Sequence, residues 1–182
     1  MGVAERILST IDGINRSIGE AVKWLVLATV LAQVANVVLR YVFSIGIVSL
    51  QQSVWYCHAL VFMLAAGYAL TCDAHVRIDV LYRDAPARRR AWTDLLGSLL
   101  LLLPFCAAVL WFGIPYVEHA WGSLETSAEM GGLPFVFLLK TVILVFAVLL
   151  GLAAVALALR AWLALRSGGS HYTAAAPAPR QP

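Results

Sequence analysis

Two residues within the apolar stretches of this chain could carry out chemistry, a lysine and a histidine. Lys140 lies roughly 10 Å inside an apolar run that begins near Leu133, at 1.5 Å per helical residue. A lysine at that depth either extends its stem to the surface or pairs with a carboxylate. Glu118, Glu125 and a partner chain are the candidates for that pair. A proton relay is not expected, because no carboxylate lies in the middle of an apolar run.

His58 lies inside another apolar run and raises a different chemistry. Two facing histidines can hold a haem between helices. No second histidine lies at a similar depth on another run, because His75, His119 and His171 fall at or beyond the run ends. We therefore interpret His58 as a lone polar residue in helix packing. A haem- or quinone-binding membrane anchor that uses His58 is the alternative function.

Other reactive patterns are missing from the sequence. It has no paired nucleophile and base, no phosphate-binding loop and no spacing typical of metal ligands. We expect no catalytic residue, no cofactor and no metal site, so the chain is not expected to be an enzyme. A formal net charge of +3 is weak evidence for nucleic-acid binding, which is not expected either.

The composition is typical of an integral membrane protein. Hydrophobic residues make up 62% of the chain and charged residues 13%, whereas soluble domains carry roughly 25% charged residues. Four apolar runs are long enough to cross a bilayer as helices, which takes about 20 residues. Helix is the backbone that satisfies its own hydrogen bonds in lipid. The sequence therefore predicts an all-α membrane protein with one four-helix domain over residues 1–166. The spans are expected at about residues 21–43, 50–72, 93–117 and 133–162.

Basic residues are distributed unevenly between the two sides of these spans. One short loop, after the first span, carries only Arg40, and the loop between the third and fourth spans has no Lys or Arg. Ten basic residues flank the spans on the other side: Arg6, Arg16, Lys23, Arg77, Arg83, Arg88, Arg89, Arg90, Arg160 and Arg166. Positive charge marks the cytoplasmic side of short loops. Both termini are therefore expected in the cytoplasm.

Two segments are expected to lie as amphipathic helices on the inner membrane surface. In the N-terminal stretch, apolar residues recur at helical spacing among charged ones. These are Val3, Ile7, Ile11, Ile14 and Ile18. Between the second and third spans, residues 72–92 carry five arginines and three aspartates. A shorter apolar face there comprises Ile78, Leu81, Tyr82 and Ala85, and a solvated basic loop is the alternative. The tail, residues 167–182, is rich in small residues and proline and is expected to be disordered.

Smaller features complete the chemical inventory. Arg40 at the end of the first span is expected to contact lipid phosphate. Asp79 flanks Arg77 and could pair with it. Asp94 is expected to open the third span, where a carboxylate suits the positive end of a helix. In the fourth span, small residues recur at the spacing of a close helix contact, which favours a partner. They are Ala147, Gly151, Ala154, Ala158 and Ala161.

No transport pathway is evident in this chain. Pathways show intramembrane charges or broken helices. Pro104 can kink the third span, but the middle of that span has no polar residue. A self-contained four-helix channel is therefore the weakest interpretation.

Seven short motifs follow one another along the chain: IDGINRSIG (11–19), VVLRYVF (37–43), LQQSVWY (50–56), DAHVRIDVLY (73–82), RRRAWTDLLG (88–97), LPF (103–105) and GGLPFVFLLK (131–140). In this order they resemble one family, the small membrane (DctQ-like) subunit of tripartite ATP-independent periplasmic (TRAP) transporters. The resemblance extends to about Leu165. It is closest to the branch associated with uptake of organic acids and mannitol-like solutes.

This resemblance implies a non-catalytic scaffold in the bacterial inner membrane. In such systems a large elevator-type subunit holds the substrate and sodium sites, and a soluble periplasmic protein delivers the substrate. The small subunit clamps the fixed part of the large one. Seven residues are expected to contact the large subunit or lipid: Arg40, Gln52, Arg77, Asp79, Arg88, Arg89 and Lys140. Gln52 departs from the family, which usually has Glu there, so contacts at this position are expected to differ.

Overall fold

The computed structural model describes residues 2–74, 85–167 and 172–175, and every regular element within them is helical. These elements are α1 (Val3–Tyr41), α2 (Val48–Thr71), α4 (Ala87–Gly97), the π-helical turn η1 (Ser98–Leu102), α5 (Leu103–Gly122) and α6 (Val136–Arg166). In this part of the chain, four helices are long and apolar enough to cross a membrane, with α4, η1 and α5 forming one of them. The predicted all-α class is confirmed for the described residues, and so are four helices long and apolar enough to cross a membrane; the bounds of the membrane-crossing parts stay a prediction.

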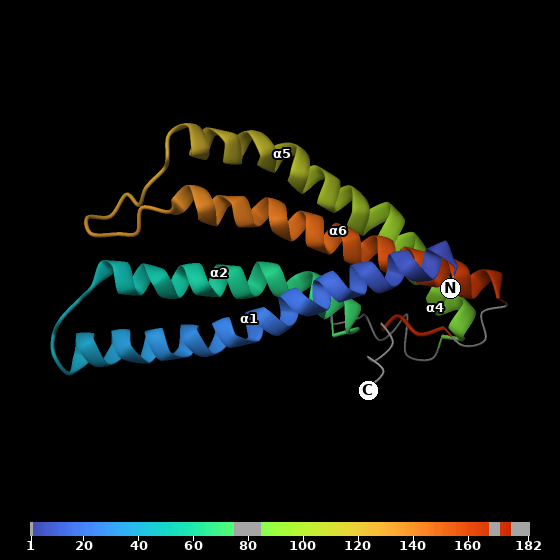
Figure 1. Cartoon of the computed structure of the whole chain (residues 1–182), viewed down its shortest axis with the longest axis horizontal. Helices are drawn as coiled ribbons and strands as arrows, with labels where there is room; N and C mark the ends of the chain where they lie inside the picture. The colour runs from blue at the N-terminus through green and yellow to red at the C-terminus, as the bar shows by residue number, and fades with distance from the viewer. Residues whose placement is uncertain (1, 75–84, 168–171, 176–182) are drawn as a thin grey trace.

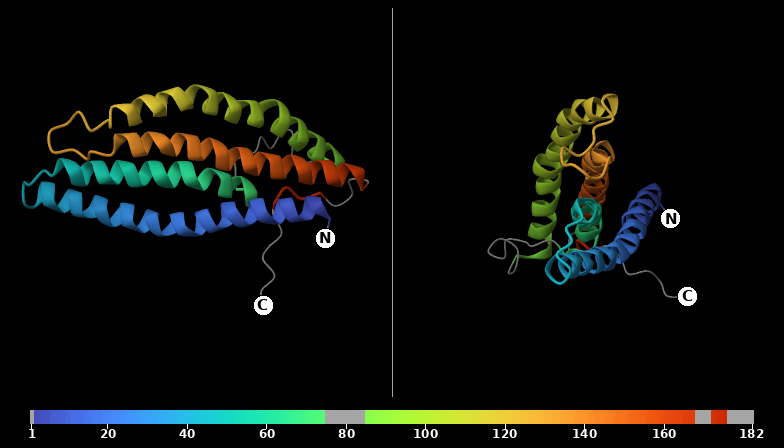
Figure 2. Two further views of the ribbon diagram at one scale, coloured as in Figure 1. Left: turned by 45° about the horizontal axis from the view of Figure 1, so that its top comes forward. Right: turned by 90° about the vertical axis from the view of Figure 1, so that its left-hand side faces the viewer.

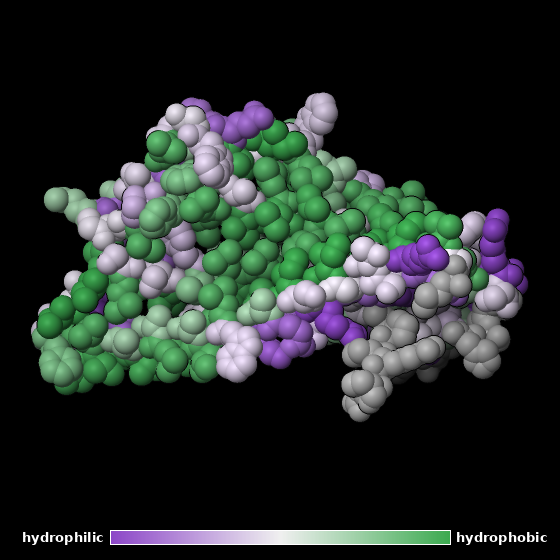
Figure 3. Space-filling view, viewed as in Figure 1, coloured by the Kyte–Doolittle hydropathy of each residue, from purple (hydrophilic) through white to green (hydrophobic). Residues whose placement is uncertain are grey.

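The four long helices lie side by side in the order α1, α2, α6, α5 (Figures 1 and 2). Packing follows that order, since α2 contacts α1 and α6, and α6 contacts α5. The central helix is therefore α6. In its apolar 18-residue stretch 44% of the residues are buried, against 11% in the corresponding stretch of α1. Hydrophobic residues cover most of the face in Figure 3. Such a surface suits surrounding lipid, because exposed hydrocarbon costs nothing there.

Small residues let α6 take this central place. Ala147, Ala154 and Ala161 are fully buried, and Ala158 is nearly so. A Cβ added at Gly151 would lie 3.7 Å from Cys106 Cβ of α5. The small-residue pattern of the fourth span therefore serves packing within the chain. The interpretation that it marks a partner contact is wrong for these alanines.

The N-terminal stretch continues directly into the first span as one helix, α1. At about 1.5 Å per residue its 39 residues extend about 58 Å. Its buried residues are Ile11, Asn15, Gly19 and Val22. Val3, Ile7 and Ile14, from the predicted amphipathic face, are exposed. That exposed face on the inner membrane surface stays a prediction.

The helix that contains the third apolar run begins at Ala87, directly after Pro86 and before the predicted start of the span near residue 93. Arginines are good helix formers, so Arg88 and Arg89 belong to the first turn. Asp94 consequently lies inside α4, and the prediction that it opens the span is wrong. The π-helical turn comes just before Pro104, which has no backbone N–H to continue the α-helical pattern. At the end of this turn the Leu103 N–H donates to the carbonyl of Ser98, five residues earlier, as in a π-helix.

The structure has two chemically distinct ends. The loop end consists of residues 42–47 and 123–135, which connect α1 to α2 and α5 to α6. The terminus end holds the start of α1, the ends of α2 and α6, and α4 (Figure 1). Ile78, Leu81 and Tyr82, together with Arg77 and Asp79, lie outside the described residues.

Candidate functional site

Gln52 of α2 forms hydrogen bonds with the connection between α5 and α6 at the loop end. Its side-chain nitrogen donates to Ser127 Oγ at 2.7 Å and to Glu129 Oε2 at 3.1 Å. Its oxygen accepts the Leu133 backbone N–H at 2.8 Å. Gln52 is buried, at 5% exposure, so these bonds replace the water that the amide loses. Both amide hydrogens are used inside the chain, and its predicted contact with a partner or lipid stays a prediction.

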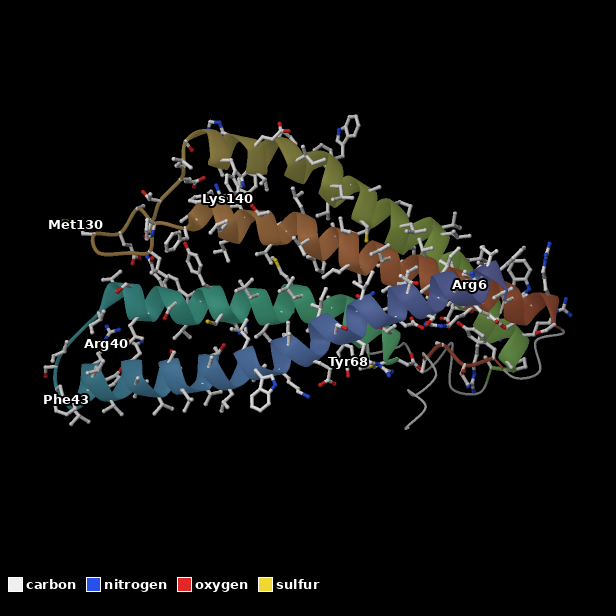
Figure 4. All side chains as sticks on the ribbon, viewed as in Figure 1. Arg6, Arg40, Phe43, Tyr68, Met130 and Lys140 are labelled. Atoms are coloured by element: carbon white, nitrogen blue, oxygen red, sulfur yellow. The ribbon has the colours of Figure 1, made fainter. Side chains whose placement is uncertain are left out.

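Lys140 is paired within the chain, at the same end. Its Nζ lies 2.5 Å from Glu125 Oε2 and 4.1 Å from the centre of the Tyr116 ring. The Lys140 side chain is 16% exposed and that of Glu125 is 36% exposed. Of the alternatives left open by the sequence, the structure has the pair with Glu125. The ammonium bridges α6, the loop and α5, and Figure 4 shows it near the beginning of α6.

An ion pair joins the first and last helices at the terminus end. Arg160 of α6 donates to Asp12 of α1 and also, at 3.3 Å, to the Ala174 carbonyl. The Tyr172 hydroxyl donates to Asp94 Oδ2 at 2.7 Å. Tyr172 and Ala174 pack on Ala91 and neighbouring residues of α6. These contacts place two residues of the tail in a packed position, while disorder of the tail as a whole stays a prediction.

Close backbone contacts join α1, α2 and α6 next to this ion pair. Asn15 is 1% exposed, and its amide nitrogen donates to the Ile11 carbonyl at 3.2 Å. A Cβ added at Gly67 would lie 2.2 Å from Asn15 Oδ1 and 3.0 Å from the Leu149 carbonyl oxygen. A Cβ at Gly19 would lie 2.3 Å from the Tyr68 ring. A Cβ enters either crossing only if a neighbouring side chain shifts, because real Cβ atoms essentially never make contacts under 3.0 Å.

An open groove of about 460 Å³ lies between the halves of α1 and α2 nearer the loop end. His58 lines it together with Thr29, Gln33 and Trp55, and with the aliphatic residues Val30, Val34 and Val54. Among residues 2–74, 85–167 and 172–175, no group of three or more His, Cys, Asp or Glu could hold a metal ion.

The remaining predicted contact residues are on the surface. Arg88 and Arg89 are exposed at the start of α4, where their guanidinium groups can reach phosphate or water. Arg40 is exposed at the end of α1 and points toward the side on which α2 lies (Figure 4). Their contact with a large subunit or lipid stays a prediction, as it does for Arg77 and Asp79.

Polar contacts thus join neighbouring elements at the loop end and at the terminus end of the structure. A comparison with family models finds a match over residues 29–164, to the model described as tripartite ATP-independent periplasmic transporters, DctQ component. The chain belongs to the DctQ family. The match begins after the motif IDGINRSIG, which lies outside it. Searches of the curated proteins and of the solved structures find no significant match.

Membership of the DctQ family makes this chain a component of a transporter, which is a non-enzymatic role. It also makes the four apolar helices those of an integral inner-membrane protein. The haem- or quinone-binding alternative is not favoured, because the matching family is a transporter component.

The sequence did not predict several contacts within this DctQ chain. Asp12 and Arg160 are 148 positions apart, and no local pattern links them. The role of Tyr172 was also missed, since the tail was expected to be disordered. The sequence signal for Asn15 is a polar residue on the same helical face as Ile11 and Val22, which could have identified it as buried.

Proposed function

We propose that this DctQ chain is the non-catalytic small permease subunit that scaffolds a large elevator-type TRAP subunit. The large subunit would take up organic acids or similar solutes, driven by sodium, after delivery by a periplasmic binding protein. In this arrangement the small subunit provides a fixed wall, while the substrate and ion sites belong to its partner.

The location of the ion pairs between elements carries this proposal. Lys140–Glu125 lies at the loop end and Asp12–Arg160 at the terminus end. Between them, the buried face of α6 consists of alanine, leucine and valine in the described chain. A transport pathway needs charges or broken helices near mid-membrane, and the buried face of α6 provides neither. A rigid row of helices with an apolar surface suits a scaffold.

The first test of the proposal is physical association. The chain is purified in mild detergent through an affinity tag, from cells that also produce a large multi-span TRAP permease subunit from the same genome. The proposal expects that permease in the eluate at a defined ratio. Recovery of the tagged chain alone, from membranes that contain the permease, would contradict it.

The proposal also places the loop end in the periplasm and the terminus end in the cytoplasm, supported by the excess of basic residues at the latter. Cys72 ends α2 and is exposed, so it can report on its own side. An impermeant maleimide should label Cys72 in inside-out vesicles and not in intact spheroplasts. A Ser44→Cys variant in a Cys72→Ser chain is the matched control for the loop end and should show the opposite pattern. Labelling of Cys72 from outside would contradict the orientation.

A further inference from the structure

The half of α1 nearer the loop end is covered much less than the half nearer the terminus end. All four buried residues of α1 lie between Ile11 and Val22. None of residues 23–41, all of which the structure describes, is buried. The groove between α1 and α2 lies in this uncovered half.

The groove wall is mostly hydrocarbon, and three residues with polar side chains, Thr29, Gln33 and His58, belong to it at mid-membrane depth. Gln33 lies about 14 Å from Trp24 and about 12 Å from Tyr41, the two aromatic residues near the ends of the apolar part of α1. Gln33 and His58 are both exposed, and within the described residues neither has a hydrogen bond to the rest of the chain. Hydrocarbon cannot hydrogen-bond an amide or an imidazole, so such groups in lipid are costly. An occupant that hydrogen-bonds them removes this cost.

A cation lies on the same side of the helix, nearer the loop end. Thr29, Gln33, Asn36 and Arg40 follow one another at steps of four, three and four residues, which places them on one face of α1. Arg40 is exposed and has no ion pair among the described residues. This polar face of α1 would therefore bind a partner with an anionic group near the membrane surface and hydrogen-bonding groups about 10 Å deeper.

Charge and depth distinguish the possible occupants. A phospholipid could place its phosphate at Arg40, but its acyl chains would then lie against Gln33 and His58. A second copy of this chain, bound in the same membrane by a two-fold axis that passes through this groove, would bring Arg40 against Arg40. A helix of another protein can carry both an acidic residue near the surface and a polar residue at mid-membrane.

We propose that this groove receives a transmembrane helix of the large TRAP subunit. That helix presents a hydrogen-bonding side chain to Gln33 and His58, and a carboxylate to Arg40. The inference rests on the proposed function and assigns its partner contact to one face of the chain.

Two neighbouring residues of α1 provide a matched test. Val30 lines the groove and is 52% exposed, whereas Leu31 is outside the groove lining and 61% exposed. Val30→Trp fills the groove, and Leu31→Trp adds a similar bulk about 100° further round α1, outside the groove lining and at nearly the same depth. Both positions are open, so both variants should fold, and their melting temperatures in detergent should match that of the native chain.

The readout is the amount of large subunit that co-purifies with the tagged chain. Val30→Trp should lower it by about tenfold or more, and Leu31→Trp by less than about twofold. Equal effects of the two variants, with normal co-purification by the native chain, would overturn the groove proposal alone. Failure of the native chain to co-purify the large subunit would overturn the proposed function, and this inference with it.

A cross-linking experiment identifies the occupant directly and does not depend on the tryptophan variants. Gln33→Cys is introduced into a chain whose three native cysteines are replaced by alanine, and a thiol-bound photo-cross-linker is activated in native membranes. An adduct with the large subunit is expected. An adduct of twice the chain mass, or one with lipid only, would overturn the proposal.

Discussion

Replacing Gln52 by glutamate tests the polar contacts of the loop end most sharply. The side-chain nitrogen of Gln52 donates two hydrogen bonds, one to Ser127 and one to Glu129. A glutamate has nearly the same shape but cannot donate. Ser127 can turn its hydroxyl toward the new carboxylate, and Leu133 can keep its bond. Glu129 loses its bond in any case, since the new side chain has no donor and two carboxylates would face each other at the 3.1 Å now spanned by a hydrogen bond.

The cost of Gln52→Glu follows from these two changes. A hydrogen bond to a charged group contributes roughly 1.5–3 kcal/mol, and the low end applies because Glu129 is exposed. Like charges at this distance in a solvent-like dielectric add about 1 kcal/mol of repulsion. The free energy of unfolding should therefore fall by about 2–3 kcal/mol.

Glu129→Gln provides the compensating change. In the double variant, the amide at position 129 can donate to the carboxylate at position 52, which restores the contact with its direction reversed. Unfolding is followed by far-UV circular dichroism as SDS is titrated into detergent-solubilised chain. The double variant should recover to within about 1 kcal/mol of the native chain. A loss below about 0.5 kcal/mol for Gln52→Glu, or no recovery in the double variant, would refute the role assigned to Gln52.

Two further stability predictions use pairs of matched positions. Lys140→Met should cost about 1 kcal/mol in the same assay, because it breaks the partly buried pair with Glu125; Lys23→Met, which removes an ion pair more than half exposed, should change stability by less than about 0.5 kcal/mol. Equal losses at the two lysines would contradict the bridging role of Lys140. Gly19→Ala should destabilise by about 1–3 kcal/mol, since its Cβ would meet a tyrosine ring of α2 at 2.3 Å. Gly13→Ala has nothing within 4 Å and should stabilise α1 by about 0.5–1 kcal/mol, so the two glycines are expected to differ in sign.

The spans could be predicted because their signal is local. Apolar runs of sufficient length define them, and the end of the second span was placed at residue 72, close to Thr71. The third span shows the limit of that signal. The first turn of its helix is rich in arginine and is predicted as loop, since hydropathy reports where a helix leaves lipid and not where the helix begins. For the same reason, hydropathy does not show that the predicted N-terminal helix continues without a break into the first apolar run, as α1 does from Val3.

The side-chain contacts depend on the tertiary path of the chain, and a single sequence does not determine it. For Lys140 the sequence limits the internal partners to Glu118 and Glu125, and the path of residues 123–135 selects Glu125. For Gln52 the resemblance indicated an unusual position, but its bonds to Ser127 and Leu133 span 75 and 81 residues. Contacts of this kind could be inferred only from the arrangement of α2 beside α6.

Reconstitution tests the scaffold role most directly. The large subunit is placed in proteoliposomes with and without this chain, and an inward sodium gradient and substrate-loaded binding protein are supplied outside. Solute accumulation should occur only when both membrane subunits are present, and the chain alone should take up nothing. Equal sodium-driven accumulation by the large subunit without this chain would contradict the scaffold role.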